Sequence, residues 1–97
     1  MSQFHFHVYI LRCADGSYYV GHTDRIETRV AQHNSGALGG WTKSRRPVEL
    51  LWSETFATRD EAFAAERRIK GWSRAKKEAL IAGDWQLLSA LSRSRQE

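Results

Sequence analysis

The stretch that decides the fold runs from Val8 to Thr23 and reads VYILRCADGSYYVGHT. Two runs rich in aromatic and β-branched residues, at 6–13 and 17–21, flank the turn sequence ADGS, and this pattern predicts a β-hairpin. Each run contains a tyrosine, Tyr9 in the first and Tyr19 in the second. Because successive side chains of a strand point to opposite faces, the length of the hairpin loop decides whether the two phenols share a face.

Two hairpin loops are compatible with these residues. A two-residue loop, Asp15-Gly16, places Tyr9 and Tyr19 on opposite faces. A three-residue loop, Ala14-Asp15-Gly16, with its glycine in the left-handed conformation of a G1 bulge, places Tyr9 opposite Gly21 and both phenols on one face. The other face then carries Val8, Ile10, Tyr18 and Val20. The sequence permits the three-residue loop without requiring it.

The rest of the chain predicts helices and one further strand around this hairpin. The expected elements are a helix at 26–34, a strand at 48–56, a helix between Thr58 and Gly71, a helix at 73–81 and a short helix at 84–92. The fold class is therefore α+β, with a small three-stranded, mainly antiparallel sheet flanked by helices in the order β-β-α-β-α-α-α. We expect one domain over 1–97, with its core at 6–82 and a polar tail at the end.

Capping residues indicate where the helices begin and end. Thr23 or Asp24 can cap the first helix, and Ser35-Gly36 can end it. Thr58, followed three positions later by Glu61, is the signature of a capping box. The segment between the first helix and the third strand, GALGGWTKSRRP at 36–47, shows no periodicity and predicts a basic, mobile loop.

Composition narrows the class of protein. The chain has 97 residues, 41% of them hydrophobic, and a formal net charge of +4, which favours a folded domain with an anionic partner such as nucleic acid. The single cysteine, Cys13, cannot form an internal disulfide and is a poor zinc framework. The N-terminus lacks the pattern of a signal peptide and no apolar run is long enough to cross a bilayer, so we expect a cytoplasmic protein without a membrane partner.

Several short motifs together resemble the GIY-YIG nuclease family. They are HVY at 7–9, YVG at 19–21, an arginine on the next helix and a glutamate on a later one. The chain is most similar to the small stand-alone bacterial members, in which YIL.C.DGS.Y.G.T is followed by R...HN.G, RRPV and a helix with E..IK, and the likeness covers about residues 6 to 82. The resemblance implies hydrolysis of phosphodiester bonds with a divalent cation, Mg²⁺ or Mn²⁺, and no small-molecule cofactor.

The resemblance also assigns roles to individual residues. It makes Tyr9 and Tyr19 the two motif tyrosines, Arg29 the active-site arginine and Glu66 the main metal ligand. Glu66 lies at helical spacing from apolar residues on its own helix, where a buried carboxylate can hold a metal ion or pair with a neighbouring arginine. A cation beside Tyr9 is needed if this phenol is to take a proton from the attacking water rather than only orient it.

Arg29 and His33 are four residues apart and so share one face of the first helix. The Arg29 guanidinium can make bidentate hydrogen bonds to phosphate oxygens and stabilise the charge that builds on them in the transition state. We expect His33 to assist by donating a hydrogen bond to the phosphate or by transferring a proton. The alternative for both is an ordinary solvated or structural side chain. Tyr19 is expected to position the water or the phosphate, and Gly21 to let the backbone approach it closely.

Two departures from the family pattern stand out. His7 occupies the position of the first motif glycine, and the only asparagine, Asn34, is not at the late position where several relatives have one. The four histidines lack the cysteine partners or close i,i+4 spacing of a zinc site, although His22 is a candidate contact for phosphate.

Basic and aromatic residues predict the contacts to nucleic acid. The candidates are Gly21, His22, Trp41, Lys43, Arg45, Arg46, Lys70 and Trp72. Interleaved cations and aromatic rings suit unpaired strands, and no helix resembles a major-groove reader, so single-stranded or branched DNA is the favoured partner. The alternatives to a DNA nuclease are a nucleic-acid-binding module without turnover and an RNA-directed nuclease. Any one of these basic residues, taken alone, is more often simply solvated. The sequence does not predict an oligomeric state.

Overall fold

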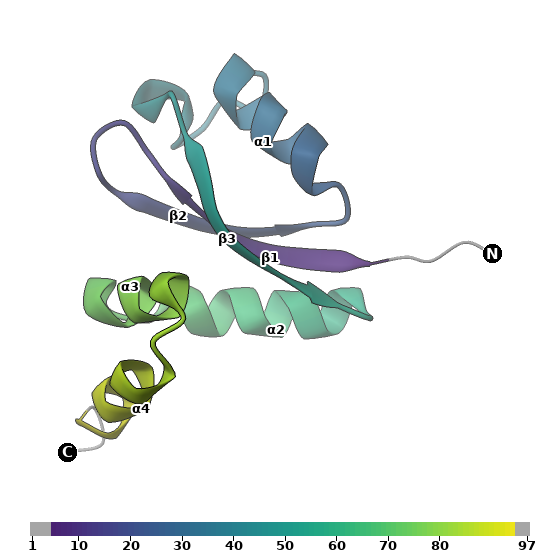
Figure 1. Cartoon of the computed structure of the whole chain (residues 1–97). Coiled ribbons are helices and arrows are strands. Elements are labelled where there is room, and N and C mark those ends of the chain that lie inside the picture. The colour runs from purple at the N-terminus through teal and green to yellow at the C-terminus, as the bar shows by residue number, and fades with distance from the viewer. Residues whose placement is uncertain (1–4, 95–97) are drawn as a thin grey trace.

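A computed structural model describes residues 5–94 and shows a three-stranded sheet between helices (Figure 1). The elements are β1 (Phe6–Arg12), β2 (Tyr18–Thr23), α1 (Ile26–Ser35), a 3-10 helix (Lys43–Arg45), β3 (Glu49–Phe56), α2 (Arg59–Lys70), α3 (Arg74–Ala82) and α4 (Trp85–Ser94). This order confirms the predicted α+β class, with the 3-10 helix as an addition inside the expected loop. The end of the predicted polar tail lies outside the described residues.

The sheet has the order β2-β1-β3, and β1 pairs antiparallel with both neighbours. Helix α1 lies on one side of the sheet, and α2 and α3 lie on the other, with α4 beyond α3 (Figure 1). Because β2 is an edge strand, side chains from both faces can meet along its outer side. In the described part of the chain no helix is both long and apolar enough to cross a membrane.

The hairpin adopts the three-residue loop. Tyr9 pairs with Gly21 and Leu11 with Tyr19, which confirms the register that brings both phenols to one face. Gly16 has a φ of 87°, the left-handed conformation that the G1 bulge requires. The backbone N–H of Ser17 donates to the Asp15 carboxylate at 3.0 Å, so the Asp-Gly-Ser sequence closes its own turn.

The two faces of the sheet bury different sets of side chains. The face covered by α1, here called the tyrosine face, buries Tyr9, Leu11, Cys13 and Val48. The opposite side, here called the α2 face, buries Val8, Ile10, Val20, Ala62, Ala65, Ile69 and Leu80. The β1 residues of the two sets alternate, with Val8 and Ile10 on one face and Tyr9 and Leu11 on the other, because the side-chain period of a strand is two.

Most predicted helix caps are present. The hydroxyl of Thr58 accepts from the backbone N–H of Glu61 at 3.1 Å, and Gly36 ends α1 with a φ of 79°. The expected N-cap of α1 by Thr23 or Asp24 is wrong: Arg25 occupies that position and no side chain caps the helix. Thr23 is buried at the end of β2, and its hydroxyl accepts from Arg25 N–H at 3.1 Å instead.

Candidate active site

The two motif tyrosines lie together over Gly21. Their ring centroids are 6.3 Å apart, and Tyr9 is almost fully buried, with an exposed fraction of 1%. A Cβ atom added at Gly21 would lie 2.6 Å from the Tyr9 hydroxyl, closer than real Cβ contacts allow. The glycine therefore leaves the space that the Tyr9 phenol occupies.

His33 links helix α1 to both the tyrosines and the loop. Its Nε2 lies 3.2 Å from the Tyr9 hydroxyl, and its Nδ1 lies 2.8 Å from the hydroxyl of Thr42. The imidazole also packs against Tyr19, with ring centroids 5.0 Å apart. His33 and Thr42 are both buried, so this hydrogen-bonded chain from Thr42 to Tyr9 is largely shielded from solvent.

Burial sets the protonation states in this cluster. Burial, together with Tyr19 and Glu66, raises the pKa of Tyr9 well above its usual value, although Arg29 acts in the opposite direction. Burial and the Arg29 charge lower the pKa of His33 below 6.5. At neutral pH the phenol is therefore protonated and the imidazole neutral, so Arg29 alone does not provide the field needed for Tyr9 to act as a free phenolate.

Glu66 is buried on α2, as its place on the apolar stripe predicts. Its Oε2 accepts from Lys70 Nζ at 2.7 Å, and its Oε1 accepts from Nδ1 of His22. Burial acts to raise the pKa of the Glu66 carboxyl, but hydrogen bonds and charge from Lys70 and His22 outweigh it and leave the pKa below its usual value. The carboxylate is thus ionised, and its charge is close enough to Tyr9 to affect that residue's pKa.

Glu66 alone could serve as the main protein ligand of a metal ion, which would replace Lys70 as the partner of one of its oxygens. Within residues 5–94 no three His, Cys, Asp or Glu side chains form a metal-binding group. Mg²⁺ often takes only one or two carboxylates, with water and substrate phosphates as its other ligands. An ionised carboxylate next to the tyrosine cluster fits that chemistry, whereas a zinc site would need more protein ligands.

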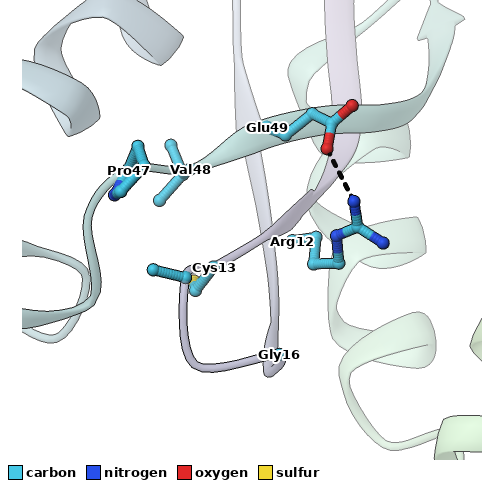
Figure 2. A pocket seen from close by; sticks show the side chains of 7 residues that line it. Arg12, Cys13, Gly16, Pro47, Val48 and Glu49 are labelled. Carbon is cyan, nitrogen blue, oxygen red and sulfur yellow. Dashed lines mark hydrogen bonds and ion pairs between the residues drawn. The ribbon is translucent and has the colours of Figure 1, made fainter.

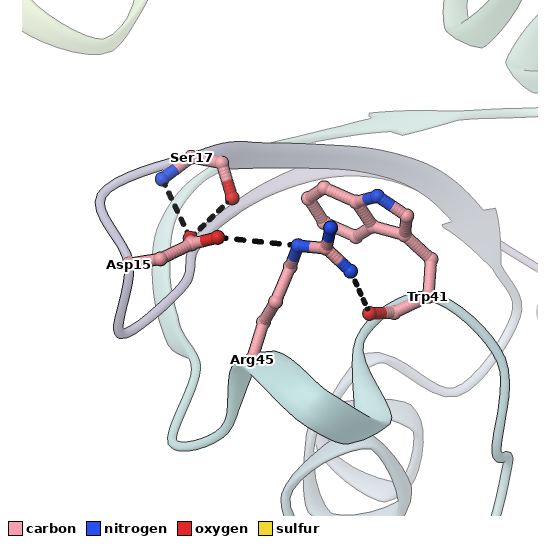
Figure 3. Close-up of polar contacts among 4 residues, drawn as sticks. All are labelled: Asp15, Ser17, Trp41 and Arg45. Atoms are coloured by element: carbon pink, nitrogen blue, oxygen red, sulfur yellow. Dashed lines mark hydrogen bonds and ion pairs between the residues drawn. The ribbon is translucent and has the colours of Figure 1, made fainter.

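The predicted nucleic-acid contacts fall into separate groups. Trp41 lies beside the cluster, because its indole stacks on Tyr19 with ring centroids 6.1 Å apart. The Arg45 guanidinium lies 3.9 Å from the indole centroid, and Figure 3 shows these two side chains together. Lys70 and His22 lie beside Glu66. The structure therefore brings these four, like Gly21, next to the predicted catalytic residues.

Three further candidates lie elsewhere. Lys43, in the 3-10 helix, is exposed, and its carbonyl accepts from Nε of Arg46, the residue that follows this helix, at 2.8 Å. Trp72 packs against the buried residues of the α2 face, with Lys76 Nζ 4.3 Å from its ring centroid. Their contacts to nucleic acid stay predictions.

A hollow at the turn end of the sheet is separate from this cluster. It has a volume of about 470 Å³ and is lined by Arg12, Cys13, Ala14, Gly16, Pro47, Val48 and Glu49 (Figure 2). Arg12 and Glu49 already pair with each other at 2.9 Å, and burial raises the pKa of the Cys13 thiol. This hollow contains no residue of the predicted site.

Sequence reasoning missed two residues that organise the site. Thr42 sits in a segment without periodicity, and only its burial marks it. Asn34 binds the backbone of Val48 in both directions, donating to its carbonyl at 3.0 Å and accepting from its N–H at 2.7 Å. The only asparagine thus has a structural role that ties α1 to the start of β3.

Comparison with known proteins agrees with this geometry. Residues 5–79 match the family model of the GIY-YIG catalytic domain. A UPF0213 protein of Bacillus pumilus is 46% identical over 81 residues, covering 84% of this chain and 83% of its own length. A UPF0213 protein of Halobacterium salinarum is 49% identical over 75 residues, covering 77% of this chain and 97% of its own length.

Two solved structures share the fold. The solution NMR structure of a UPF0213 protein from Bacillus halodurans is 38% identical, covers 80% of this chain and 83% of its own, and has a TM-score of 0.53. That of a protein from E. faecalis is also 38% identical, covers 88% and 90%, and has a TM-score of 0.58. By its matched domain and its relatives, the chain belongs to the GIY-YIG family, whose catalytic domain implies a nuclease acting on nucleic acid.

Proposed function

We propose that this chain is an endonuclease that hydrolyses phosphodiester bonds of single-stranded or branched DNA, with Mg²⁺ or Mn²⁺ held mainly by Glu66. The observation that carries the proposal is the buried hydrogen-bonded chain from Thr42 through His33 to Tyr9. Arg29 acts on the pKa of both Tyr9 and His33, so its charge lies beside that chain. Proton transfer and anion stabilisation are therefore available within one cluster.

The hydrogen bonds offer a route for the proton of the attacking water. Protonated Tyr9 donates to Nε2 of neutral His33, which leaves the phenol oxygen free to accept from water, while Nδ1–H of His33 donates to Thr42. As the water oxygen bonds to phosphorus and the bond to the leaving oxygen breaks, one water proton passes to Tyr9 and the Tyr9 proton passes to His33. Tyr9 then never has to exist as a free phenolate, and His33, whose lowered pKa keeps it neutral beforehand, takes the proton only as the phosphate reacts.

Arg29 and Tyr19 act on the phosphate. The Arg29 guanidinium has the geometry to bind phosphate oxygens in pairs and to stabilise the charge that develops on them. Tyr19, half-buried between His33 and Trp41, positions the water or the phosphate. A divalent cation bound at Glu66 would stabilise the charge on the leaving oxygen.

The preference for unpaired DNA rests on the surface beside the cluster. Trp41 is an exposed aromatic next to Tyr19, and Arg45 and Lys70 are cations within the same region. Aromatic rings with neighbouring cations bind splayed bases and backbone phosphates without requiring a defined sequence.

Cleavage assays test this proposal. Wild type is compared with Arg29→Ala and Glu66→Gln on single-stranded, duplex and flap DNA and on RNA, each with Mg²⁺, Mn²⁺ or EDTA. We expect metal-dependent cleavage that is fastest on single-stranded or flap DNA, with kcat/KM at least about 100-fold lower in both variants. Arg68→Ala and Glu61→Gln make the same charge changes at exposed positions of α2 and should cut like wild type.

The outcomes separate the alternatives. If Arg29→Ala and Glu66→Gln cut as well as wild type, the site assignment is wrong. Binding of DNA without cleavage under every metal condition indicates a binding module, and faster cleavage of RNA than of any DNA indicates an RNA-directed nuclease.

A further inference from the structure

A second pocket adjoins the catalytic cluster at the outer edge of β2. It has a volume of about 280 Å³ and is lined by Tyr18, Tyr19, Val20, Trp41, Lys70 and Lys77. Tyr19 belongs to this pocket and also packs against His33, with ring centroids 5.0 Å apart. A group that fills the pocket therefore lies one side chain away from the predicted catalytic residues.

One wall of the pocket is a fixed, exposed aromatic surface. The Trp41 ring is tilted only 24° from the Tyr19 ring, and Trp41 keeps an exposed fraction of 44%. Arg45 lies over the indole, donates to the Trp41 carbonyl at 2.7 Å and pairs with Asp15 at 3.2 Å, which ties the indole to the hairpin turn (Figure 3). The indole is thus held in place before any ligand arrives, which reduces the entropy cost of binding, and a base can contact the part of the ring that Arg45 and Tyr19 leave exposed.

The other wall carries positive charge. Lys70 is paired with Glu66 at 2.7 Å, and Lys77 is half-buried one helix further along. No ion-pair partner for Lys77 occurs among residues 5–94, since the nearby Glu78 pairs with Arg74 at 3.1 Å. Burial and the neighbouring Arg74 lower the pKa of the Lys77 ammonium, so an anion at this position would stabilise its charged form.

We propose that this edge pocket binds one nucleotide of an unpaired strand next to the bond that is cut, with its base against Trp41 and Tyr19 and its phosphate at Lys77. The inference rests on the proposed nuclease function and names the substrate group that lies beside the reacting phosphate. The volume of about 280 Å³ suits one nucleotide. A base inside a duplex is stacked and paired and cannot enter, so the pocket selects unpaired DNA.

Binding in EDTA tests the pocket without any need for cleavage. The probe is a 5′-phosphorylated oligothymidylate, titrated into the full chain and followed by NMR shifts. We expect Trp41→Ala to weaken binding about 5- to 100-fold and Trp41→Phe to restore most of it, because base stacking on an aromatic ring is lost and then regained. Lys77→Ala should reduce the slope of log K against log salt by about 0.7, the value for one phosphate contact on a single strand, and Arg68→Ala should leave the slope unchanged.

Abasic substrates test the place of the pocket relative to the cut. A single abasic residue is moved stepwise along a cleavable strand, and kcat/KM is measured for wild type and Trp41→Ala. In wild type we expect one position beside the cut to slow cleavage about 10-fold, and in Trp41→Ala the same abasic residue should have almost no further effect.

The inference is overturned if Trp41→Ala and Lys77→Ala bind the oligothymidylate like wild type while Arg29→Ala still abolishes cleavage. That result supports the proposed nuclease function and excludes nucleotide binding in the edge pocket. If no substrate is cut but the two pocket variants lose binding as described, the proposed nuclease function fails and the nucleotide pocket stands.

Discussion

The two faces of this sheet differ in what they bury. On the α2 face, Val8, Ile10 and Val20 pack against alanines, Ile69 and Leu80. On the tyrosine face, buried hydroxyl and imidazole groups lie among the apolar side chains and satisfy one another by hydrogen bonds. Alternate residues of the same strands thus supply part of a core on one side and the two tyrosines of the predicted catalytic cluster on the other.

The difference teaches how a small domain can separate stability from chemistry. Apolar burial on the α2 face stabilises the fold, while the predicted catalytic residues other than Glu66 lie on or beside the tyrosine face. At the edge strand β2, His22 pairs with Glu66 on the α2 face, while Tyr19 lies on the tyrosine face. Substitutions on the two faces should therefore have different signatures.

The largest effect is expected from the core on the α2 face. Ile10→Ala removes a fully buried side chain there and should lower the free energy of unfolding by about 2–5 kcal/mol. Urea denaturation followed by circular dichroism measures this, with kcat/KM determined on the folded fraction. A folded Ile10→Ala protein that has lost catalysis would contradict the separation of the two faces.

Gly21→Ala should act in the opposite way, on activity more than on stability. The added methyl collides with the Tyr9 hydroxyl at 2.6 Å and displaces the phenol from His33, so kcat should fall about 100-fold. Gly71→Ala is the matched control, because the nearest atom to its added Cβ is an ordinary 3.6 Å away. Equal activity of the two alanine variants would show that the position of the phenol does not matter.

Thr42→Val tests the far end of the hydrogen-bonded chain. It keeps the shape of the side chain but leaves His33 Nδ1 without its partner, so we expect kcat to fall about 10-fold, the size of one buried hydrogen bond. Thr42→Ser keeps the hydroxyl and should retain most of the activity. The prediction fails if Ser and Val substitutions have the same effect on kcat and on its pH profile.

The smallest expected effect is the pH dependence of stability that His33 contributes. Because the pKa of His33 is lowered below 6.5 by burial and by Arg29, the unfolded chain binds this proton at higher pH than the folded chain. The contribution of neutral His33 to stability is therefore fully present above about pH 6.5 and declines as the pH falls toward the lower folded value. In Arg29→Met the pKa of His33 should rise toward 6.5, which an NMR titration of the ring measures; an unchanged pKa would show that burial alone sets it.

The sequence predicted the helix ends well where the contacts that set them lie between near neighbours in the chain. Thr58 and Gly36 set helix ends through contacts with their own neighbours, and these ends are confirmed. The register of the hairpin stayed open between two loops because both satisfy the turn chemistry of Asp15 and Gly16. In the structure Arg45, from a distant segment, also binds Asp15 at 3.2 Å, and no local rule could have supplied that contact.

The candidate site could be predicted only in part for the same reason. The helical spacing of Glu66 predicted its burial, which the structure confirms. Its two partners were not predicted together, since His22 reaches it across the edge of the sheet from another element. Thr42 is a polar residue in a loop, and nothing in its neighbours indicates that it meets a histidine nine positions earlier in the chain.

The hydrogen bonds of the Asn34 side chain bear on how helix α1 unfolds locally. Helix α1 buries only His33, and two hydrogen bonds from Asn34 to Val48 fasten its C-terminal end to β3. Ile26 and Val30 of this helix pack on the tyrosine face but are only partly buried, so α1 is expected to detach in a local unfolding event before the whole chain unfolds. Amide hydrogens of α1 should then exchange faster than those of α2. Since α1 carries Arg29 and His33, each such opening removes two predicted catalytic residues while the core of the α2 face is still intact.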